Sequence, residues 1–254
     1  MDYYYLTDPG KVRTHNEDSV IIVKDKSGEY LMAVADGMGG HKGGEIASSI
    51  AISHIGKKFE ELENIGTKES AINWIQTEVS EANSLIYKYT AEHPESAGMG
   101  TTLVLALVTK EFLLFGNIGD SSGFVYKNKM IHKITNDHTL VNLLVKSGEL
   151  TPEEAKDHPR KNVLMRALGA STKVEMDIFD VETDIDGIFL CSDGLTNMLT
   201  KEQIEKVLID EELNEEGKLI KLIKKCNARG GTDNITVAYL VKEGGIEWYK
   251  RGKK

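Results

Sequence analysis

Apolar residues recur along the first third of the chain with two different spacings. Two short runs, 19–24 and 30–35, are rich in β-branched and apolar residues and are separated by a polar turn that includes Gly28, which predicts a β-hairpin. In 45–62 and 68–92 the apolar residues recur every three or four positions, which places them on one face of a helix. We therefore predict a hairpin followed by two amphipathic helices.

Strand-like runs return in the middle and at the end of the chain. Four of them, at short spacing, predict a meander: 101–109, 112–118, 123–126 and 130–134. Three later runs predict further strands: 174–181, 187–191 and 234–241. Between these blocks, 138–170 predicts a helical excursion over the sheet, and 200–228 predicts a pair of helices.

Helices that enter in pairs between blocks of strands do not fit a regular alternation of strand and helix. Each sheet and each helix must bury its apolar face against another layer. This order of elements therefore favours an α+β fold in which antiparallel sheets pack together and helices cover their outer faces.

Charge and composition exclude several classes of function. The 254 residues include 31 Lys and Arg against 40 Asp and Glu, which gives a net charge of −9, and no basic stripe suited to nucleic acid phosphates is present. We interpret the short basic cluster in 243–254 as a solvated, flexible tail. The N-terminus lacks a signal-peptide pattern, and no apolar run approaches the ~18 residues of a membrane helix. We expect neither nucleic acid binding nor membrane insertion.

The two cysteines, Cys191 and Cys226, have no CxxC spacing and predict free reduced thiols. Such thiols fit a reducing compartment, so we expect a cytoplasmic protein. A chain of this length can bury roughly 70 to 75% of its unfolded surface and needs no structural metal for stability. We therefore expect a bound metal to serve the function.

Aspartates stand at the ends of the predicted strands, mostly beside glycine: Asp36, Asp120, Asp193 and Asp233. A single Asp-Gly pair is most simply a turn, but turns alone do not require four of them. If the strand ends converge, the carboxylate oxygens select Mg²⁺ or Mn²⁺ over Zn²⁺, and their mutual repulsion requires cations. Two such ions could activate a water and hold the attacking and leaving oxygens, which is the chemistry of phosphoryl hydrolysis.

The segment 13–18 adds a guanidinium and two carboxylates before the first long strand. Arg13 is of the residue type that clamps a phosphate dianion, although an arginine near Glu17 and Asp18 is also an ordinary surface ion pair. The glycine-rich run 37–44 opens a helix and could present backbone donors to an anion. It matches neither the P-loop nor the dinucleotide fingerprint, which disfavours nucleotide binding.

Eight motifs follow one another in an order that is specific to one protein family. They are TDPGKVRTHNED (7–18), VADGMGGHKGGEIAS (34–48), GTT (100–102), GNIGDSS (116–122), TNDHTLV (135–141), RALG (166–169), CSDGL (191–195) and GGTDNITV (230–237). From about residue 3 to 242 the chain resembles the bacterial PPM family, the metal-dependent serine/threonine protein phosphatases of the protein phosphatase 2C type. The expected fold is then a four-layer αββα sandwich: two mostly antiparallel β-sheets packed face to face, helices on both outer faces and a small helical flap at about 138–170.

The resemblance implies a binuclear centre that holds Mn²⁺ or Mg²⁺. Asp36 would bridge the two ions, and the carbonyl of Gly37 would bind one of them. Asp193 and Asp233 would complete the centre.

The resemblance also implies a third, looser ion held by Asp120, Asp193 and Asp18. Glu17 would act on the centre through a water molecule, and Arg13 would bind the substrate phosphate. The flap would lie beside the active site and affect substrate choice and the binding of the third ion.

Two positions depart from the family pattern. Animal relatives often carry a histidine, proposed as the general acid, after the glycine of the DG motif, but this chain has Met38, and a thioether cannot donate that proton. His41 is the nearest candidate for this catalytic role. Ser122 replaces the arginine of the common GDSR motif, so any contact of that arginine is absent.

The function implied is hydrolysis of phosphoserine and phosphothreonine in proteins by a water between two ions, in opposition to a serine/threonine kinase. The catalytic domain would comprise residues 1–242 of a monomeric protein. Neither cysteine is expected to be the nucleophile, because Cys191 is followed by Ser-Asp-Gly-Leu rather than by an anion-binding loop and an arginine.

Two alternatives stay open. One is a two-metal phosphohydrolase that acts on small phosphate esters or nucleotides. The other is a binding protein on the same fold that has lost catalysis, although every expected ligand position is filled here.

Overall fold

Two antiparallel sheets form the centre of the molecule in a computed structural model that describes residues 1–39 and 43–242. The first sheet has the order β1 (Asp2–Asp8), β11 (Ile235–Val241), β10 (Gly187–Cys191), β7 (Ser122–Lys127), β8 (Met130–Lys133). The second has the order β2 (Asp18–Lys24), β3 (Tyr30–Met38), β5 (Leu103–Val108), β6 (Leu113–Ile118), β9 (Asp177–Val181). The short β4 (Gly100–Thr101) pairs with the end of β3.

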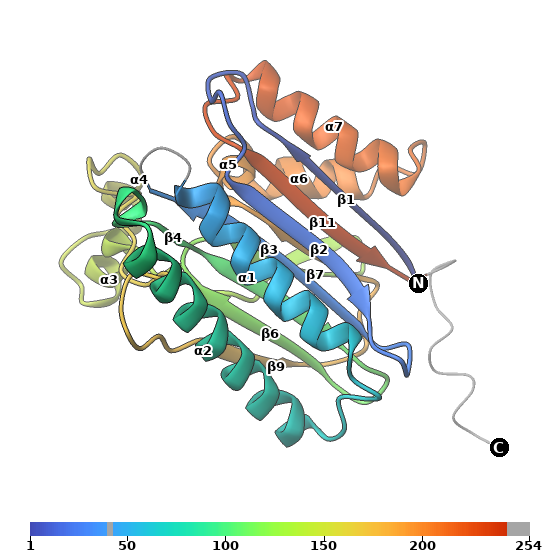
Figure 1. Cartoon of the computed structure of the whole chain (residues 1–254). Coiled ribbons are helices and arrows are strands. Elements are labelled where there is room, and N and C mark those ends of the chain that lie inside the picture. The colour runs from blue at the N-terminus through green and yellow to red at the C-terminus, as the bar shows by residue number, and fades with distance from the viewer. Residues whose placement is uncertain (40–42, 243–254) are drawn as a thin grey trace.

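Helices cover the outer face of each sheet, as Figure 1 shows. The second sheet is covered by α1 (Gly43–Glu60) and α2 (Lys68–Glu92). The first is covered by α5 (Asp193–Thr196), α6 (Lys201–Leu208) and α7 (Glu215–Ala228). Two short helices, α3 (Leu140–Lys146) and α4 (Pro152–Lys156), lie in the predicted flap, and a 3₁₀ turn, η1 (Pro94–Ser96), follows α2.

The alternation of side chains along the strands produces the layers. In β5, Leu103 and Leu105 face the helices α1 and α2, whereas Val104 and Ala106 face the other sheet. Side chains alternate between the two faces in the same way along β11, where Val237 packs under the helices of the first sheet. Three buried apolar clusters result, one between the sheets and one under each helical layer. The predicted four-layer αββα sandwich is confirmed.

Several helices begin where the sequence supplies a capping side chain. Thr67 accepts a hydrogen bond from the backbone N–H of Ser70 at the start of α2, and Asn214 accepts one from Gly217 at the start of α7. Such caps satisfy backbone donors that have no partner within the helix. The remaining stabilisation of each helix comes from its apolar face, exemplified by Phe59 of α1, which is fully buried.

The predicted elements are recovered with three exceptions. The four runs in 101–134 do not form one meander, because β5 pairs with β6 in the second sheet whereas β7 pairs with β8 in the first. No strand was predicted at the N-terminus, yet β1 pairs with β11 along its whole length. The run 174–181 was predicted as one strand, but only Asp177–Val181 pairs with β6, because the preceding residues find no partner strand there.

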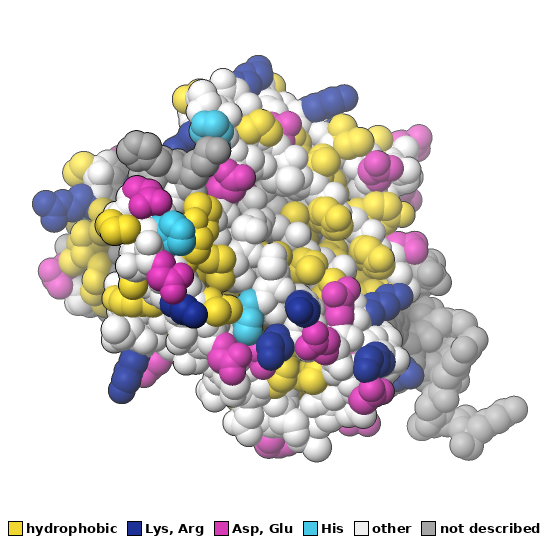
Figure 2. Space-filling view, in the orientation of Figure 1, with side chains coloured by type: hydrophobic (Ala, Val, Ile, Leu, Met, Phe, Trp, Pro, Cys, Tyr) yellow, Lys and Arg dark blue, Asp and Glu magenta, His cyan; other side chains and the backbone are white. Residues whose placement is uncertain are grey.

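The surface agrees with the acidic composition. Figure 2 shows basic and acidic side chains interspersed on one face rather than gathered into a basic field. Within 1–39 and 43–242, the helices are too short or too polar to cross a bilayer. The predicted tail, 243–254, lies outside the described residues.

Candidate metal centre

Acidic side chains from both sheets meet at one end of the sandwich. Asp18, the first residue of β2, stands directly opposite Asp36 of β3 in the antiparallel register. Asp193 begins α5 just after β10, and Asp233 lies two residues before β11, the neighbour of β10. Asp120 follows β6 by two residues. The topology therefore places the five carboxylates at adjacent strand ends.

Most of the predicted site residues line one open pocket of about 940 Å³. Its lining is Arg13, Glu17, Asp36, Gly37, Met38, Gly39, Thr102, Asp120, Asn162, Leu164, Asp193 and Asp233. The structure thus brings together eight of the nine predicted site residues, counting Asp18 behind the pocket. The ninth, His41, lies outside the described residues.

Asp18 is the most enclosed carboxylate of the group, with 9% of its surface exposed. Its Oδ2 accepts a hydrogen bond of 2.7 Å from Ser192, but its Oδ1 has no partner among the described residues. Burial raises the pKa of Asp18 to about 7, since the hydrogen bonds from Thr236 and Ser192 only partly offset that cost and the charges of nearby aspartates add to it.

Burial and the charges of neighbouring aspartates also raise the pKa values of three other carboxylates. Burial raises the pKa of Asp36 well above its ordinary value, and the charges of Asp18 and Asp193 raise it further. Burial and then Asp193 raise the pKa of Asp120 to about 7. Burial and then Asp233 raise the pKa of Asp193, although a hydrogen bond shared with Asp36 opposes this.

This donor set fits divalent cations. The group consists of hard carboxylate oxygens that repel one another in a partly dry pocket, and one of them is buried without a hydrogen bond. A cation among these oxygens would remove the repulsion that raises their pKa values. The roles of individual aspartates as ligands stay predictions.

Arg13 stands on the rim of the pocket. Its Nη2 donates to Oδ2 of Asp233 at 2.9 Å, and about half of its side chain stays exposed. An exposed ion pair of this kind contributes little to stability. Its main effect is therefore to direct the guanidinium toward the aspartates while leaving donors free for an anion.

The backbone of Glu17 is held between the two sheets. Its N–H donates to Oδ1 of Asn234 at 2.9 Å, and its carbonyl accepts from Ser48 of α1 and from the N–H of Gly37. A Cβ on Gly37 would collide with the carbonyl of Gly44 and lie 2.6 Å from that of Glu17. Only glycine lets the end of β3 approach both segments this closely.

His138 holds the turn that carries Asp120. Gly119 donates its N–H to His138 Nδ1 at 3.2 Å and accepts the His138 N–H at 2.9 Å. Because Nδ1 accepts, the ring proton lies on Nε2, which donates to Oδ2 of Asp177 at 3.1 Å. Burial raises the pKa of Asp177, but hydrogen bonds from His138 and Arg166 outweigh it and hold the pKa below its ordinary value.

The predicted flap begins at the same histidine. The carbonyl of His138 accepts from the N–H of Met165 at 2.7 Å, and Thr139 forms a bridge with Leu164. Leu164 in turn lines the pocket. One short segment therefore joins the flap to the turn of Asp120.

Several polar side chains that support the site were not predicted as functional positions: Thr102, Asn117, His138, Ser192, Asn234 and Thr236. For those that lie on strands, the alternation of side chains along the strand was a signal in the sequence. Along β10 the residues that face the other sheet are Ile188 and Leu190, and Ser192 continues that row. Counting by two from the apolar residues of each strand would have placed these polar groups inside the molecule.

Cys191 is unsuited to nucleophilic chemistry. It is completely buried, and burial raises the pKa of its thiol far above the range in which a thiolate forms. Both cysteines are free, as predicted, and both are buried.

Comparison with known proteins identifies the family. A family model described as protein phosphatase 2C matches residues 11–218. The serine/threonine phosphatase stp of Listeria welshimeri is 41% identical over 238 residues, which cover 93% of this chain and 94% of that protein. Protein phosphatase PhpP of Streptococcus pneumoniae is 35% identical, with 94% and 96% covered. The chain belongs to the protein phosphatase 2C family.

Solved structures agree with this assignment. The serine/threonine phosphatase Stp1 from Staphylococcus aureus superposes with a TM-score of 0.90 at 34% identity, over 96% of this chain and 95% of that one. The catalytic domain of PstP in complex with two manganese ions gives a TM-score of 0.79 at 32% identity, over 94% and 96%. The family is metal dependent, in agreement with the chemistry of the pocket.

The raised pKa values predict how stability depends on pH. Asp18 and Asp120 have folded-state pKa values of about 7, above those of the unfolded chain. Their contribution is therefore present at low pH and is lost as the pH rises through about 7. We expect the chelated protein to melt at a lower temperature at about pH 8 than at about pH 5.5, and Asp18→Asn to reduce this difference.

Scanning calorimetry in the presence of a chelator measures this effect. The control is Asp157→Asn, which changes an exposed aspartate of the flap. Identical pH profiles for the wild type and Asp18→Asn would contradict the assignment.

Proposed function

We propose that this pocket hydrolyses phosphoserine and phosphothreonine esters in proteins, with Mn²⁺ or Mg²⁺ as resident ions and water as the nucleophile. The observation that carries the proposal is the group of strand-end carboxylates in one pocket with the guanidinium of Arg13 on its rim. Relatives in Listeria welshimeri and Staphylococcus aureus are named serine/threonine phosphatases, and this chain matches them over nearly their whole length.

In this proposal Asp36, Asp193 and Asp233 hold two ions together with the carbonyl of Gly37. Asp120 and Asp18, with Asp193, hold a third. When bound, the ions lower the pKa of a water and place positive charge against the phosphoryl oxygens. Glu17, which lines the same pocket, would act through a water molecule.

Arg13 binds and orients the phosphate dianion. Its hydrogen bond to Asp233 uses one nitrogen of a guanidinium that lines the pocket, and the other N–H groups can engage a phosphate there. In the reaction the water oxygen forms a bond to phosphorus and gives up a proton to solvent, the ester bond breaks, and the serine or threonine oxygen leaves with a proton from the general acid. Met38 lines the pocket but cannot supply that proton, so His41 is the proposed donor.

The lining favours phosphoproteins over nucleotides. Among the described residues of the pocket none is aromatic, so a nucleobase would find no stacking surface there. Asn162 and Leu164 of the flap line the same pocket as the strand-end aspartates, so they could contact the residues around a phosphorylated side chain.

The remaining proposals concern the cellular setting. The substrates would include proteins phosphorylated by a serine/threonine kinase, and the protein would act as a cytoplasmic monomer. Two buried free cysteines fit a reducing compartment. A single catalytic domain over 1–242 is supported by the pairing of β1 with β11, which joins the two ends of this range in one sheet.

Asp193→Asn tests the metal centre. Asparagine keeps the shape of the side chain but removes a ligand charge, so we expect phosphate release from a phosphothreonine peptide to fall by about 100-fold or more at a fixed Mn²⁺ concentration. Chelation should abolish turnover of the wild type. Circular dichroism checks folding, and Asp157→Asn serves as the control. Equal turnover with and without chelator would contradict the proposal.

Arg13→Ala tests the phosphate contact. Loss of a charge-assisted hydrogen bond pair should lower kcat/KM by about 10- to 100-fold, mainly through a higher KM at saturating Mn²⁺. Arg13→Lys keeps the charge but not the planar guanidinium, so its kcat/KM should lie between those of the wild type and Arg13→Ala. Lys11→Ala, an exposed cation two residues away, should leave the kinetics unchanged. An unchanged KM for Arg13→Ala would exclude this role.

A substrate panel separates the two phosphohydrolase functions. At matched Mn²⁺ we expect kcat/KM for phosphoserine and phosphothreonine peptides to exceed that for nucleotides and small phosphate esters. Steady-state phosphate release measures each member of the panel. A preference for nucleotides would favour the alternative.

A further inference from the structure

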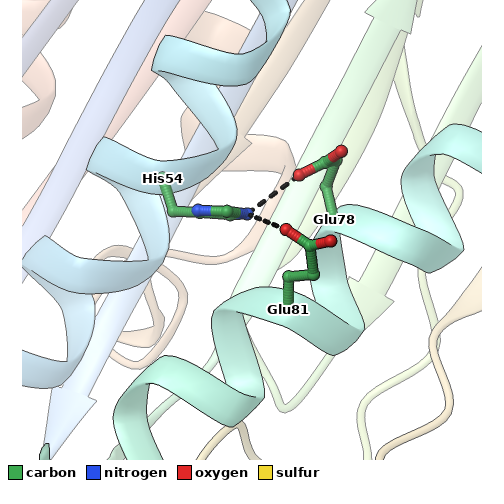
Figure 3. Close-up of side chains that lie close together, drawn as sticks. All are labelled: His54, Glu78 and Glu81. Carbon is green, nitrogen blue, oxygen red and sulfur yellow. Dashed lines mark hydrogen bonds and ion pairs between the residues drawn. The ribbon is translucent and has the colours of Figure 1, made fainter.

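A second group of metal-ligating side chains lies outside the catalytic pocket, between α1 and α2. Figure 3 shows His54 of α1 pointing toward Glu78 and Glu81, which stand three residues apart on α2. The Nε2 of His54 is 2.8 Å from Oε2 of Glu78 and 3.6 Å from Oε2 of Glu81. Among the described residues, one atom of each of the three side chains lies within 4.8 Å of the other two.

The burial of these side chains distinguishes the group from a surface ion pair. The side chains of His54 and Glu78 are 12% and 11% exposed, whereas that of Glu81 is 53% exposed. In the described part of the chain both glutamates form their ion pairs with His54. A neutral imidazole would leave the enclosed carboxylate of Glu78 with one hydrogen bond and no positive charge, which is costly in a dry environment.

The spacing fits a tetrahedral ion. Bonds of about 2.0 to 2.2 Å to imidazole nitrogen and carboxylate oxygen place neighbouring ligands about 3.3 Å apart. The two distances from His54 Nε2 lie on either side of that value. Because Glu81 is exposed, a fourth position is open to water. The imidazole nitrogen favours Zn²⁺ over Mg²⁺ or Ca²⁺, which prefer all-oxygen sites.

We propose that His54, Glu78 and Glu81 bind one Zn²⁺ ion and thereby cross-link α1 to α2. The Nε2 lone pair forms the bond to zinc, so the zinc-bound ring is neutral and carries its proton on Nδ1. The proton now in the hydrogen bond between Nε2 and Glu78 leaves to solvent. Each glutamate contributes one oxygen, and water fills the fourth position. The catalytic aspartates take no part in this site.

The ion would act on the support of the catalytic pocket. Ser48, near the start of the same helix as His54, donates at 2.6 Å to the carbonyl of Glu17, which lines that pocket. A link between the middle of α1 and α2 therefore restrains the helix on which this contact depends. The effect expected is on thermal stability rather than on the chemical step.

The test separates this site from the catalytic one. In an Asp36→Asn/Asp193→Asn background, zinc titration by calorimetry should give one more ion per chain than the same background with His54→Gln. Saturating Zn²⁺, at about 100 times Kd, should raise Tm by about 5 to 10 °C, and His54→Gln should abolish the shift. Glutamine can still hydrogen bond to Glu78, so the helix contact is retained. Glu92→Gln, an exposed glutamate at the end of α2, is the matched control.

The coordination is identified independently with Co²⁺, whose visible absorption is intense in a tetrahedral nitrogen and oxygen site. Loss of this spectrum in Glu78→Gln supports the site. Unchanged Mn²⁺-dependent turnover of His54→Gln on an otherwise wild-type chain also supports it. Equal zinc stoichiometry and equal Tm shifts with and without His54 would overturn the proposal. That result would leave the function of the catalytic pocket untouched.

Discussion

Repulsion among carboxylates at one end of the sandwich is the constraint on which the rest of the structure depends. Burial and mutual charge raise the pKa values of Asp18, Asp36, Asp120 and Asp193 together. A folded state that holds such a group must recover the cost elsewhere, and three buried apolar clusters supply that stabilisation. Cation binding and folding are therefore linked, because ions that relieve the repulsion bind the folded chain alone.

Strand register is what makes the convergence possible. Along β2 and β3 the side chains that face the other sheet end in Asp18 and Asp36, which continue the rows of Ile22 and Val34. The apolar layer between the sheets thus changes into a polar one at the catalytic end without any break in the strands. A shift of one residue in this pair would turn Asp18 to the helical face and separate it from Asp36.

Much of this arrangement could be predicted from the sequence because its signals are local. Apolar runs and helical spacing located most elements, and the aspartates at the ends of four buried runs indicated where the pocket lies. The strand β1 was missed because it is an edge strand whose Tyr3 and Tyr5 are exposed, so its sequence lacks the apolar run of a central strand. His138 was missed as a support because its partners, Gly119 and Asp177, are distant in sequence and meet it only in the fold.

The support at His138 also bears on how substrate and metal affect one another. The same residue fixes the turn of Asp120 through its ring and the return of the flap through its carbonyl, which accepts from Met165. A displacement of the flap at this point therefore strains the hydrogen bonds of Gly119, one residue before Asp120. In the proposed site, a protein substrate in contact with Leu164 and a cation bound by Asp120 would act on opposite ends of this short chain of contacts. Coupling between them would then need no large motion, only the transmission of strain through the hydrogen bonds that His138 makes with Gly119 and Met165.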